Sequence, residues 1–140
     1  MPTDDSHDRF DLDELTAHAV SIAREAGELA RTRRAEGVTV AATKSAIADV
    51  VTEADREVER LIRDRISAAR PDDGFYGEET GADRGASGLT WVVDPIDGTV
   101  NYLYGIPHYA VSIAVVAGEP RAAEWQQLVG VVFNPANGEL

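Results

Sequence analysis

One short stretch, Trp-Val-Val-Asp-Pro-Ile-Asp-Gly-Thr at residues 91–99, constrains the fold more than any other part of the chain. Its first three residues are bulky and apolar, which predicts a short buried strand. Pro95 disfavours helical geometry at the residue before it and donates no hydrogen bond to a sheet, so we expect the strand to end at Asp94. The strand therefore delivers two carboxylates, a glycine and a threonine hydroxyl into one tight turn.

The same turn also fits an ordinary helix start. Aspartate is a preferred N-cap residue, proline is favoured at the first helical position, and a further acidic residue in the first turn complements the helix dipole. Asp94, Pro95 and Asp97 satisfy this pattern. These nine residues alone therefore leave both a catalytic turn and a plain helix cap open.

Composition limits the classes of partner and cofactor. The 140 residues are enough for one domain with its own core. The absence of cysteine excludes disulfides, a thiolate nucleophile and a cysteine-ligated zinc site. The formal net charge of -12 disfavours binding to nucleic acid or an anionic membrane, and no apolar run is long enough to cross a bilayer. We therefore expect a cytoplasmic protein that binds neither nucleic acid nor membrane.

The first amphipathic helix is predicted by apolar residues that recur at spacings of three and four. It follows a polar segment at residues 1–10, which we expect to be a mobile tail. The helix should start near Leu12 and end at Arg33 or Arg34, where cations complement the helix dipole and Gly37 lies just beyond. Its apolar stripe comprises Leu12, Leu15, Ala19, Ile22, Ala26, Leu29 and Ala30.

A second amphipathic helix is expected after a short strand at residues 38–42 and a loop at residues 44–49. Thr52 and Asp55 form a capping-box pattern at its start, and Pro71 follows its end. Its apolar stripe comprises Val51, Ala54, Val58, Leu61, Ile62, Ile66 and Ala69.

The remainder of the chain predicts strands and turns. Besides residues 91–93, apolar β-prone runs are at residues 75–77, 110–116 and 128–133, and residues 80–88 read as a loop. Asn137-Gly138 is a hairpin-turn dipeptide with only two residues after it. We therefore expect the chain to be the N-terminal part of a longer polypeptide.

Several carboxylates stand out as candidate metal ligands. The candidates are Asp55, Glu78, Glu79, Asp94 and Asp97, with Lys44 and Thr99 as polar companions. Carboxylate clusters without sulfur or imidazole suit Mg²⁺, which keeps positions open for water and phosphate oxygens. Taken singly, Asp55 also fits a helix cap, and Lys44 and the two glutamates also fit solvent-exposed positions.

The order of these residues resembles one known family. Asp94-Pro95-Ile96-Asp97-Gly98-Thr99, with Trp91 ahead of it, is similar to the signature of the inositol monophosphatase family, the lithium-sensitive Mg²⁺-dependent phosphatases. Three further motifs match in order over about residues 15–140. They are Lys44-Ser45 leading through Asp49, Val51 and Thr52 to Asp55; Gly77-Glu78-Glu79; and Pro107 with Val111-Ser112-Ile113.

The resemblance implies a role for each candidate. The implied ligands of two or three Mg²⁺ ions are oxygen atoms of Glu78, Glu79, Asp94, Ile96 and Asp97, the isoleucine through its backbone carbonyl. The implied catalytic residues are Glu78, which also holds the attacking water, and Thr99, which activates that water together with Asp55. The implied substrate contacts come from Lys44, Asp97, Gly98 and Thr99.

The resemblance also implies a fold and a missing half. The fold would be α+β, a layered α/β sandwich with a mainly antiparallel sheet and two N-terminal helices, usually assembled as a homodimer. Family members are roughly twice as long, and their second half supplies another metal-binding aspartate and most contacts to the alcohol. Residues 11–140 would then be the N-terminal α+β part, truncated before the C-terminal half, and the enzymatic interpretation concerns the longer protein.

The function implied first is Mg²⁺-dependent hydrolysis of myo-inositol 1-phosphate or a similar polyol phosphate to the alcohol and inorganic phosphate. Within the same superfamily, histidinol phosphate, fructose 1,6-bisphosphate or a nucleotide 3′-phosphate are alternative substrates. From a different class, a non-catalytic interaction module that retains the fold is also open.

Overall fold

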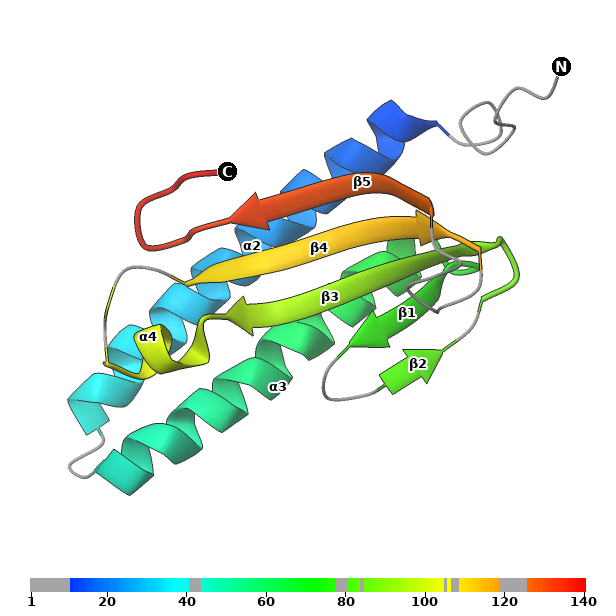
Figure 1. Ribbon diagram of the computed structural model, residues 1–140. Helices are drawn as coiled ribbons and strands as arrows, with labels where there is room; N and C mark the ends of the chain where they lie inside the picture. The colour runs from blue at the N-terminus through cyan, green and yellow to red at the C-terminus, as the bar shows by residue number, and fades with distance from the viewer. Residues whose placement is uncertain are drawn as a thin grey trace, which may run out of the picture.

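The computed structural model (Figure 1) describes most of the chain. The described residues are 11–40, 44–77, 81–83, 85–104, 106, 109–118 and 126–140. For residues 37–40, 44–50, 81, 82, 100, 103 and 104 the description covers the main chain and not the side chain. The predicted tail at residues 1–10 lies outside the described residues.

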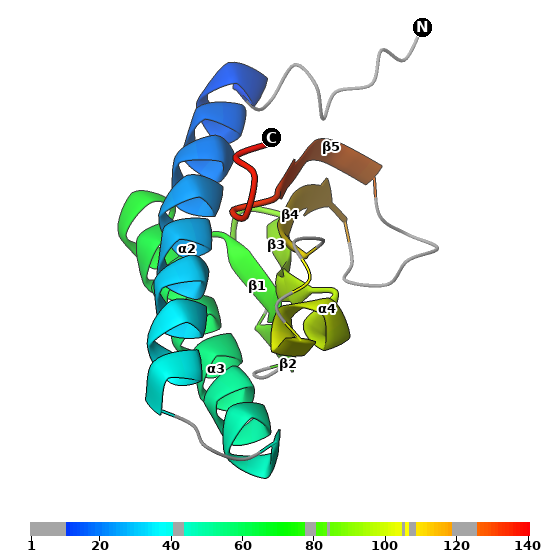
Figure 2. The ribbon, with the colours of Figure 1, turned by 90° about the vertical axis from the view of Figure 1, so that its left-hand side faces the viewer.

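Two long helices lie against one face of a five-stranded sheet, as Figure 2 shows. The strand order is β2-β1-β3-β4-β5. β1 and β3 are parallel, whereas β1–β2, β3–β4 and β4–β5 are antiparallel. The prediction of an α+β fold with two N-terminal helices and a mainly antiparallel sheet is confirmed.

Helix α2 (Leu12–Val40) is longer than the sequence predicts. The predicted end at Arg33 or Arg34 and the predicted strand at residues 38–42 are wrong for the described residues, since the helix continues past Gly37 to Val40. Just before this extension, Arg33 Nε donates to Glu57 Oε2 on the second helix at 2.8 Å, and Arg34 Nε donates to the Tyr102 carbonyl at 2.5 Å.

Helix α3 (Lys44–Ala69) also starts earlier than predicted. The predicted loop at residues 44–49 is helical, and Thr52 and Asp55 lie two to three turns inside the helix, so they do not cap it. The reason is that no glycine or proline interrupts residues 44–69, and alanines favour the helix there.

No described helix has a segment long and apolar enough to cross a membrane.

The core lies between the helices and the sheet. Both predicted stripes face it, except that Ala69 is exposed and Leu12, Leu29 and Leu61 are partly buried. From the sheet, the core receives Phe75, Leu89, Trp91, Val93, Ile96, Val111, Ile113, Val115, Val129, Val131 and Phe133. Removing these side chains from water is the main favourable term in forming the two layers.

The strands match the predicted runs with one addition. They are β1 (Gly74–Gly77), β2 (Gly81–Asp83), β3 (Leu89–Asp97), β4 (Ala110–Ala117) and β5 (Gln126–Phe133). β2 falls within residues 80–88, where a loop is predicted, and it forms because its residues pair with β1 at the sheet edge. The predicted turn at Asn137-Gly138 is present and brings Asn134 into a β-bridge with Glu139.

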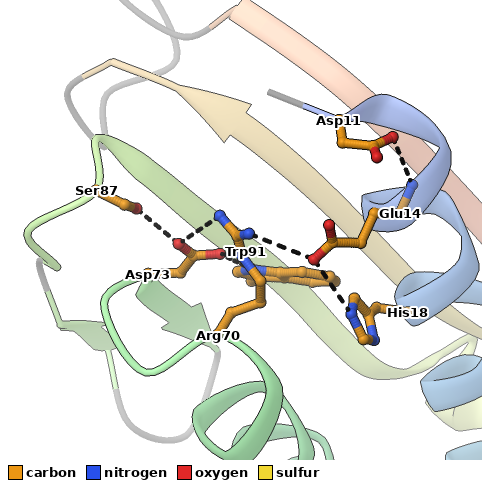
Figure 3. A network of polar contacts seen from close by, with 7 residues as sticks. All are labelled: Asp11, Glu14, His18, Arg70, Asp73, Ser87 and Trp91. Carbon is orange, nitrogen blue, oxygen red and sulfur yellow. Dashed lines mark hydrogen bonds and ion pairs between the residues drawn. The ribbon is translucent and has the colours of Figure 1, made fainter. Parts of the chain in front are cut away.

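A polar network holds the start of β3 in place (Figure 3). The side chain of Asp73 is 1% exposed and accepts hydrogen bonds from Trp91 Nε1 at 2.9 Å and Ser87 Oγ at 2.7 Å. Arg70 donates to the same carboxylate through Nε at 2.8 Å and Nη2 at 3.2 Å. Arg70 also lies 3.7 Å from Glu14 of α2, so the network links both helices to the strand that leads to residues 94–99.

Candidate functional site

The candidate site begins at a β-bulge near the end of β3. Asp94 pairs with Ser112 and Asp97 pairs with Ala110, so one extra residue lies on β3 between the two pairs. The prediction that the strand ends at Asp94 is therefore wrong: β3 continues to Asp97. A bulge is one of the few places where a sheet accepts proline, because the bulged strand leaves ladder hydrogen bonds unmade, and Pro95 occupies it.

The short helix α4 (Thr99–Tyr104) follows the end of β3, as Figure 1 shows. Asp94 consequently does not cap a helix, and the plain helix-cap interpretation of residues 94–97 is wrong. Gly98 has a φ of 91°, a left-handed conformation that favours glycine, and its carbonyl accepts the Tyr102 amide at 3.0 Å. The Thr99 hydroxyl donates to the Ile96 carbonyl at 3.1 Å, which closes the turn.

The parallel strand β1 ends beside Asp94. Its last residue, Gly77, pairs with Val93, one residue before Asp94, and the arrowheads of both strands point the same way in Figure 1. The two strands therefore end as parallel neighbours in the sheet. Glu78 and Glu79 follow Gly77 in the sequence and lie outside the described residues.

Asp55 lies on α3, which contacts both β3 and α4. Burial is the main cause that raises the pKa of Tyr102 in α4, followed by the nearby Tyr109, and the negative charge of Asp55 adds to the effect. Asp55 therefore lies within electrostatic reach of α4. The predicted link between Asp55 and Thr99 stays a prediction, as does the role of Lys44, whose side chain is not described.

The two aspartates of the turn differ in exposure. Asp94 is half-buried, whereas Asp97 is exposed at the end of the strand. An open hollow of about 340 Å³ adjoins this end of the sheet. It is lined by Asp97, Gly98, Tyr109, Ala110, Val132 and Asn134. A small polar molecule can therefore approach Asp97 and Gly98 from solvent.

Tyr102 anchors the turn to α2, and sequence reasoning missed it. The side chain is fully buried, its hydroxyl donates to the Ala30 carbonyl at 2.7 Å, and its ring meets Tyr109 edge-on at 4.9 Å between centroids. Arg34 of α2 holds the Tyr102 carbonyl. The only sequence signal is an aromatic residue in the first turn after Thr99, which does not reveal a partner 72 residues away.

The chemistry of the described donors suits a hard cation. Three buried carboxylate oxygens accept no hydrogen bond within the described part of the chain, namely Asp55 Oδ1, Asp94 Oδ1 and Glu59 Oε2, although each of these residues takes part in at least one other interaction. The first two belong to predicted site residues, and buried oxygens of this kind are commonly satisfied by water or an ion. Among the described residues, no three His, Cys, Asp or Glu side chains form a metal-binding group. Two of the five predicted ligands, Glu78 and Glu79, lie outside the described residues.

Comparison with known proteins gives a consistent result. A family model described as the inositol monophosphatase family matches residues 11–140. An inositol-1-monophosphatase of Mycobacterium leprae is 43% identical over 144 aligned positions, which cover 91% of this chain and 50% of the relative. A histidinol-phosphatase of Chlorobaculum parvum is 47% identical over 90 positions, covering 64% of this chain and 32% of the relative.

A solved structure shows the same arrangement. SuhB of Mycobacterium tuberculosis superimposes with a TM-score of 0.70 and 41% sequence identity over 89% of this chain and 41% of that chain. The chain thus spans between a third and a half of the length of these relatives. The ordered motifs, the bulged end of β3 and the match over residues 11–140 lead to one conclusion: the chain belongs to the inositol monophosphatase family.

Proposed function

We propose that this chain provides the metal-binding turn of a Mg²⁺-dependent phosphomonoesterase that hydrolyses myo-inositol 1-phosphate or a similar polyol phosphate. The observation that carries the proposal is the bulged end of β3, which places Asp94, Asp97, Gly98 and Thr99 in one turn beside the end of β1. Membership of a phosphatase family supports it, and so does the open hollow next to Asp97.

The proposed metal ligands are oxygen atoms on two neighbouring strand ends. Asp94 and Asp97 lie at the end of β3 together with the carbonyl of Ile96, and the sequence places Glu78 and Glu79 directly after β1. Two or three Mg²⁺ ions bound by such ligands would polarise the phosphoryl oxygens, lower the pKa of a water and stabilise the leaving oxygen. Their oxygen-only chemistry and the buried Asp94 Oδ1 are compatible with this role.

The remaining residues bind phosphate and prepare water. Glu78 would hold the attacking water, and the Thr99 hydroxyl would orient it and take its proton while passing its own proton to the Asp55 carboxylate, which is the final proton acceptor. The amides of Gly98 and Thr99 and the ammonium group of Lys44 contact the phosphate. The left-handed φ of Gly98 supports the amide contacts, because a glycine there lets the main chain turn tightly and leaves no Cβ in the way of a ligand.

Release of inorganic phosphate tests the proposal. We expect the full-length protein that contains these residues to release phosphate from myo-inositol 1-phosphate only when Mg²⁺ is present, and Asp97→Asn in that protein to lose the release because a ligand charge is removed. Asp64→Asn is the matched control, since Asp64 is an exposed aspartate of α3 outside the proposed site. Unchanged turnover in Asp97→Asn would refute the metal assignment, and no release from any ester tested would refute the activity for these residues.

Histidinol phosphate is the second candidate substrate, because the relative from Chlorobaculum parvum is a histidinol-phosphatase at 47% identity. A panel of both esters at equal concentration, compared by kcat/KM, separates the two. Inhibition by lithium and assembly into a homodimer belong to the same proposal. They are tested by the panel with added Li⁺ and by light scattering of the purified chain.

A further inference from the structure

Helix α3 carries a line of charged residues along the side that faces β1. Asp55, Glu59 and Arg63 are spaced four residues apart, which places them on one face of the helix. Glu59 is 1% exposed and lies between the buried apolar residues Val58 and Ile62. A glutamate is almost never fully buried unless the structure uses its charge, so this position calls for a physical explanation.

The spacing of this line matches the spacing of β1. The Arg63 guanidinium lies over the Phe75 ring, 5.0 Å from its centroid, and the Glu59 carboxylate lies against Gly77. Four helical residues advance about 6 Å and two strand residues about 6.6 Å, so consecutive turns of α3 meet alternate residues of β1. Asp55 lies one turn further in the same direction, towards the candidate site.

The Glu59 carboxylate occupies the space beside Gly77. A Cβ atom built on Gly77 would overlap the carboxylate, 2.7 Å from Glu59 Cδ, and would lie 2.8 Å from Phe75 Cε1. Gly77 is not among the glycines with positive φ, so its backbone conformation does not demand glycine. The glycine therefore serves to let the end of β1 approach the buried carboxylate.

This contact lies at the edge of the site. Gly77 pairs with Val93, and Val93 precedes Asp94. An apolar side chain would fill the place of Glu59 with less desolvation cost, so the burial of a carboxylate here needs a compensating role.

We propose that Glu59 and Gly77 form a positioning pair that fixes the end of β1 against Asp94 and thereby sets the affinity of the site for Mg²⁺. This inference rests on the proposed function for its metal, while the contact itself belongs to the metal-free chain. Glu59 is a positioning residue and acts through β1. Replacing an orienting partner of a metal ligand typically weakens metal affinity about 10- to 100-fold.

Glu59→Gln tests the pair with an almost isosteric side chain that lacks the charge. Glu53→Gln is the matched control, because Glu53 is an exposed glutamate of the same helix. Two quantities are measured on each folded variant: the Mg²⁺ dissociation constant by isothermal titration calorimetry, and amide hydrogen exchange at residues 74–77 and 92–94 without metal. We expect Glu59→Gln to raise the dissociation constant about 10-fold or more and to speed exchange at both segments, with Glu53→Gln unchanged.

A double-mutant cycle keeps the test valid if Glu59→Gln folds poorly. Gly77→Ala should weaken Mg²⁺ binding through the overlap, and Glu59→Asp in the same chain should restore part of it by drawing the carboxylate back. Such non-additivity is expected only of residues in contact. Additive effects of the two substitutions would overturn the pair.

The outcomes separate this inference from the proposed function. Wild-type exchange rates in Glu59→Gln overturn the positioning role, and so does an unchanged Mg²⁺ dissociation constant in a chain that binds Mg²⁺. If the wild-type chain binds no Mg²⁺, the proposed function fails. The exchange rates of the metal-free variants then decide alone whether Glu59 holds the end of β1.

Discussion

Replacing Asp73 by asparagine should destabilise the fold strongly although the two side chains have the same shape. The carboxylate accepts four hydrogen bonds: Oδ2 from Arg70 Nε and Trp91 Nε1, and Oδ1 from Ser87 Oγ and Arg70 Nη2. An asparagine has one acceptor oxygen, so one pair of these donors must face an amide NH₂. The Ser87 hydroxyl can reverse and accept, whereas neither Arg70 nor Trp91 can.

The magnitude follows from this choice. The favourable orientation keeps the amide oxygen on Arg70 Nε and Trp91 Nε1 and turns the NH₂ towards Ser87 and Arg70 Nη2. Both arginine bonds lose their charge assistance, and one becomes a contact between two donors. Breaking a buried ion pair costs about 3–5 kcal/mol. Because the Arg70 side chain is 25% exposed and can be partly rehydrated, we expect about 2–4 kcal/mol for this variant.

Urea denaturation followed by far-UV circular dichroism measures the loss. Asp72→Asn is the matched control, because Asp72 is the exposed neighbour of Asp73 in the same turn, and we expect a change within about 0.5 kcal/mol. The Asp73 reasoning is refuted if the free energy of unfolding falls by less than about 1 kcal/mol or by no more than in the control.

Three further results are expected. Tyr102→Phe leaves the Ala30 carbonyl without its buried hydroxyl donor and should lower the free energy of unfolding by about 1–3 kcal/mol at pH 7. Urea denaturation measures this loss. Tyr76→Phe is the control, because Tyr76 is exposed, and it should lower the free energy of unfolding far less. Burial raises the pKa of Tyr102 above its ordinary 10.0, so the stabilisation by its hydroxyl is fully present below pH 10 and is lost as the pH rises through the folded pKa. The difference in the free energy of unfolding between wild type and Tyr102→Phe should therefore narrow above pH 10. A difference that stays constant with pH would contradict this. Gly98→Ala and Gly88→Ala place alanine at φ values of 91° and 88°, so each should lower the free energy of unfolding by about 1–2 kcal/mol. Only Gly98→Ala should also lower the rate of phosphate release. Equal rates of phosphate release in the two variants would exclude a role of Gly98 in the site.

The sequence predicts the elements well where a pattern is local. The apolar stripes of α2 and α3 and the runs that become β1, β3, β4 and β5 are each visible within a few residues. Errors occur at boundaries: α2 passes Gly37, α3 starts at Lys44, and β3 continues through Pro95. Pairing with β4 extends β3, whereas α3 starts early because its own residues favour the helix.

The candidate site shows the same division. The identities of Asp94, Asp97, Gly98 and Thr99 are apparent from the motif, and their closeness follows from their adjacency in sequence. The burial of Asp73 and Glu59 was not predictable, because an aspartate after a helix and a glutamate on a charged helix are usually solvated. Their partners lie on other elements of the fold.

The sequence by itself determined the two long helices, the strands β1, β3, β4 and β5, the family and the oxygen-rich turn after the apolar run at residues 91–93, because periodicity and motif order are properties of neighbouring residues. Only the tertiary structure decided that this turn is a β-bulge rather than a helix cap, that Tyr102 ties it to α2, and that Glu59 lies beneath the end of β1. The physical reason is that these features depend on which surfaces meet. Pairing with β4 carries the strand past Pro95, and packing of α3 on β1 makes a buried glutamate and a glycine depend on each other.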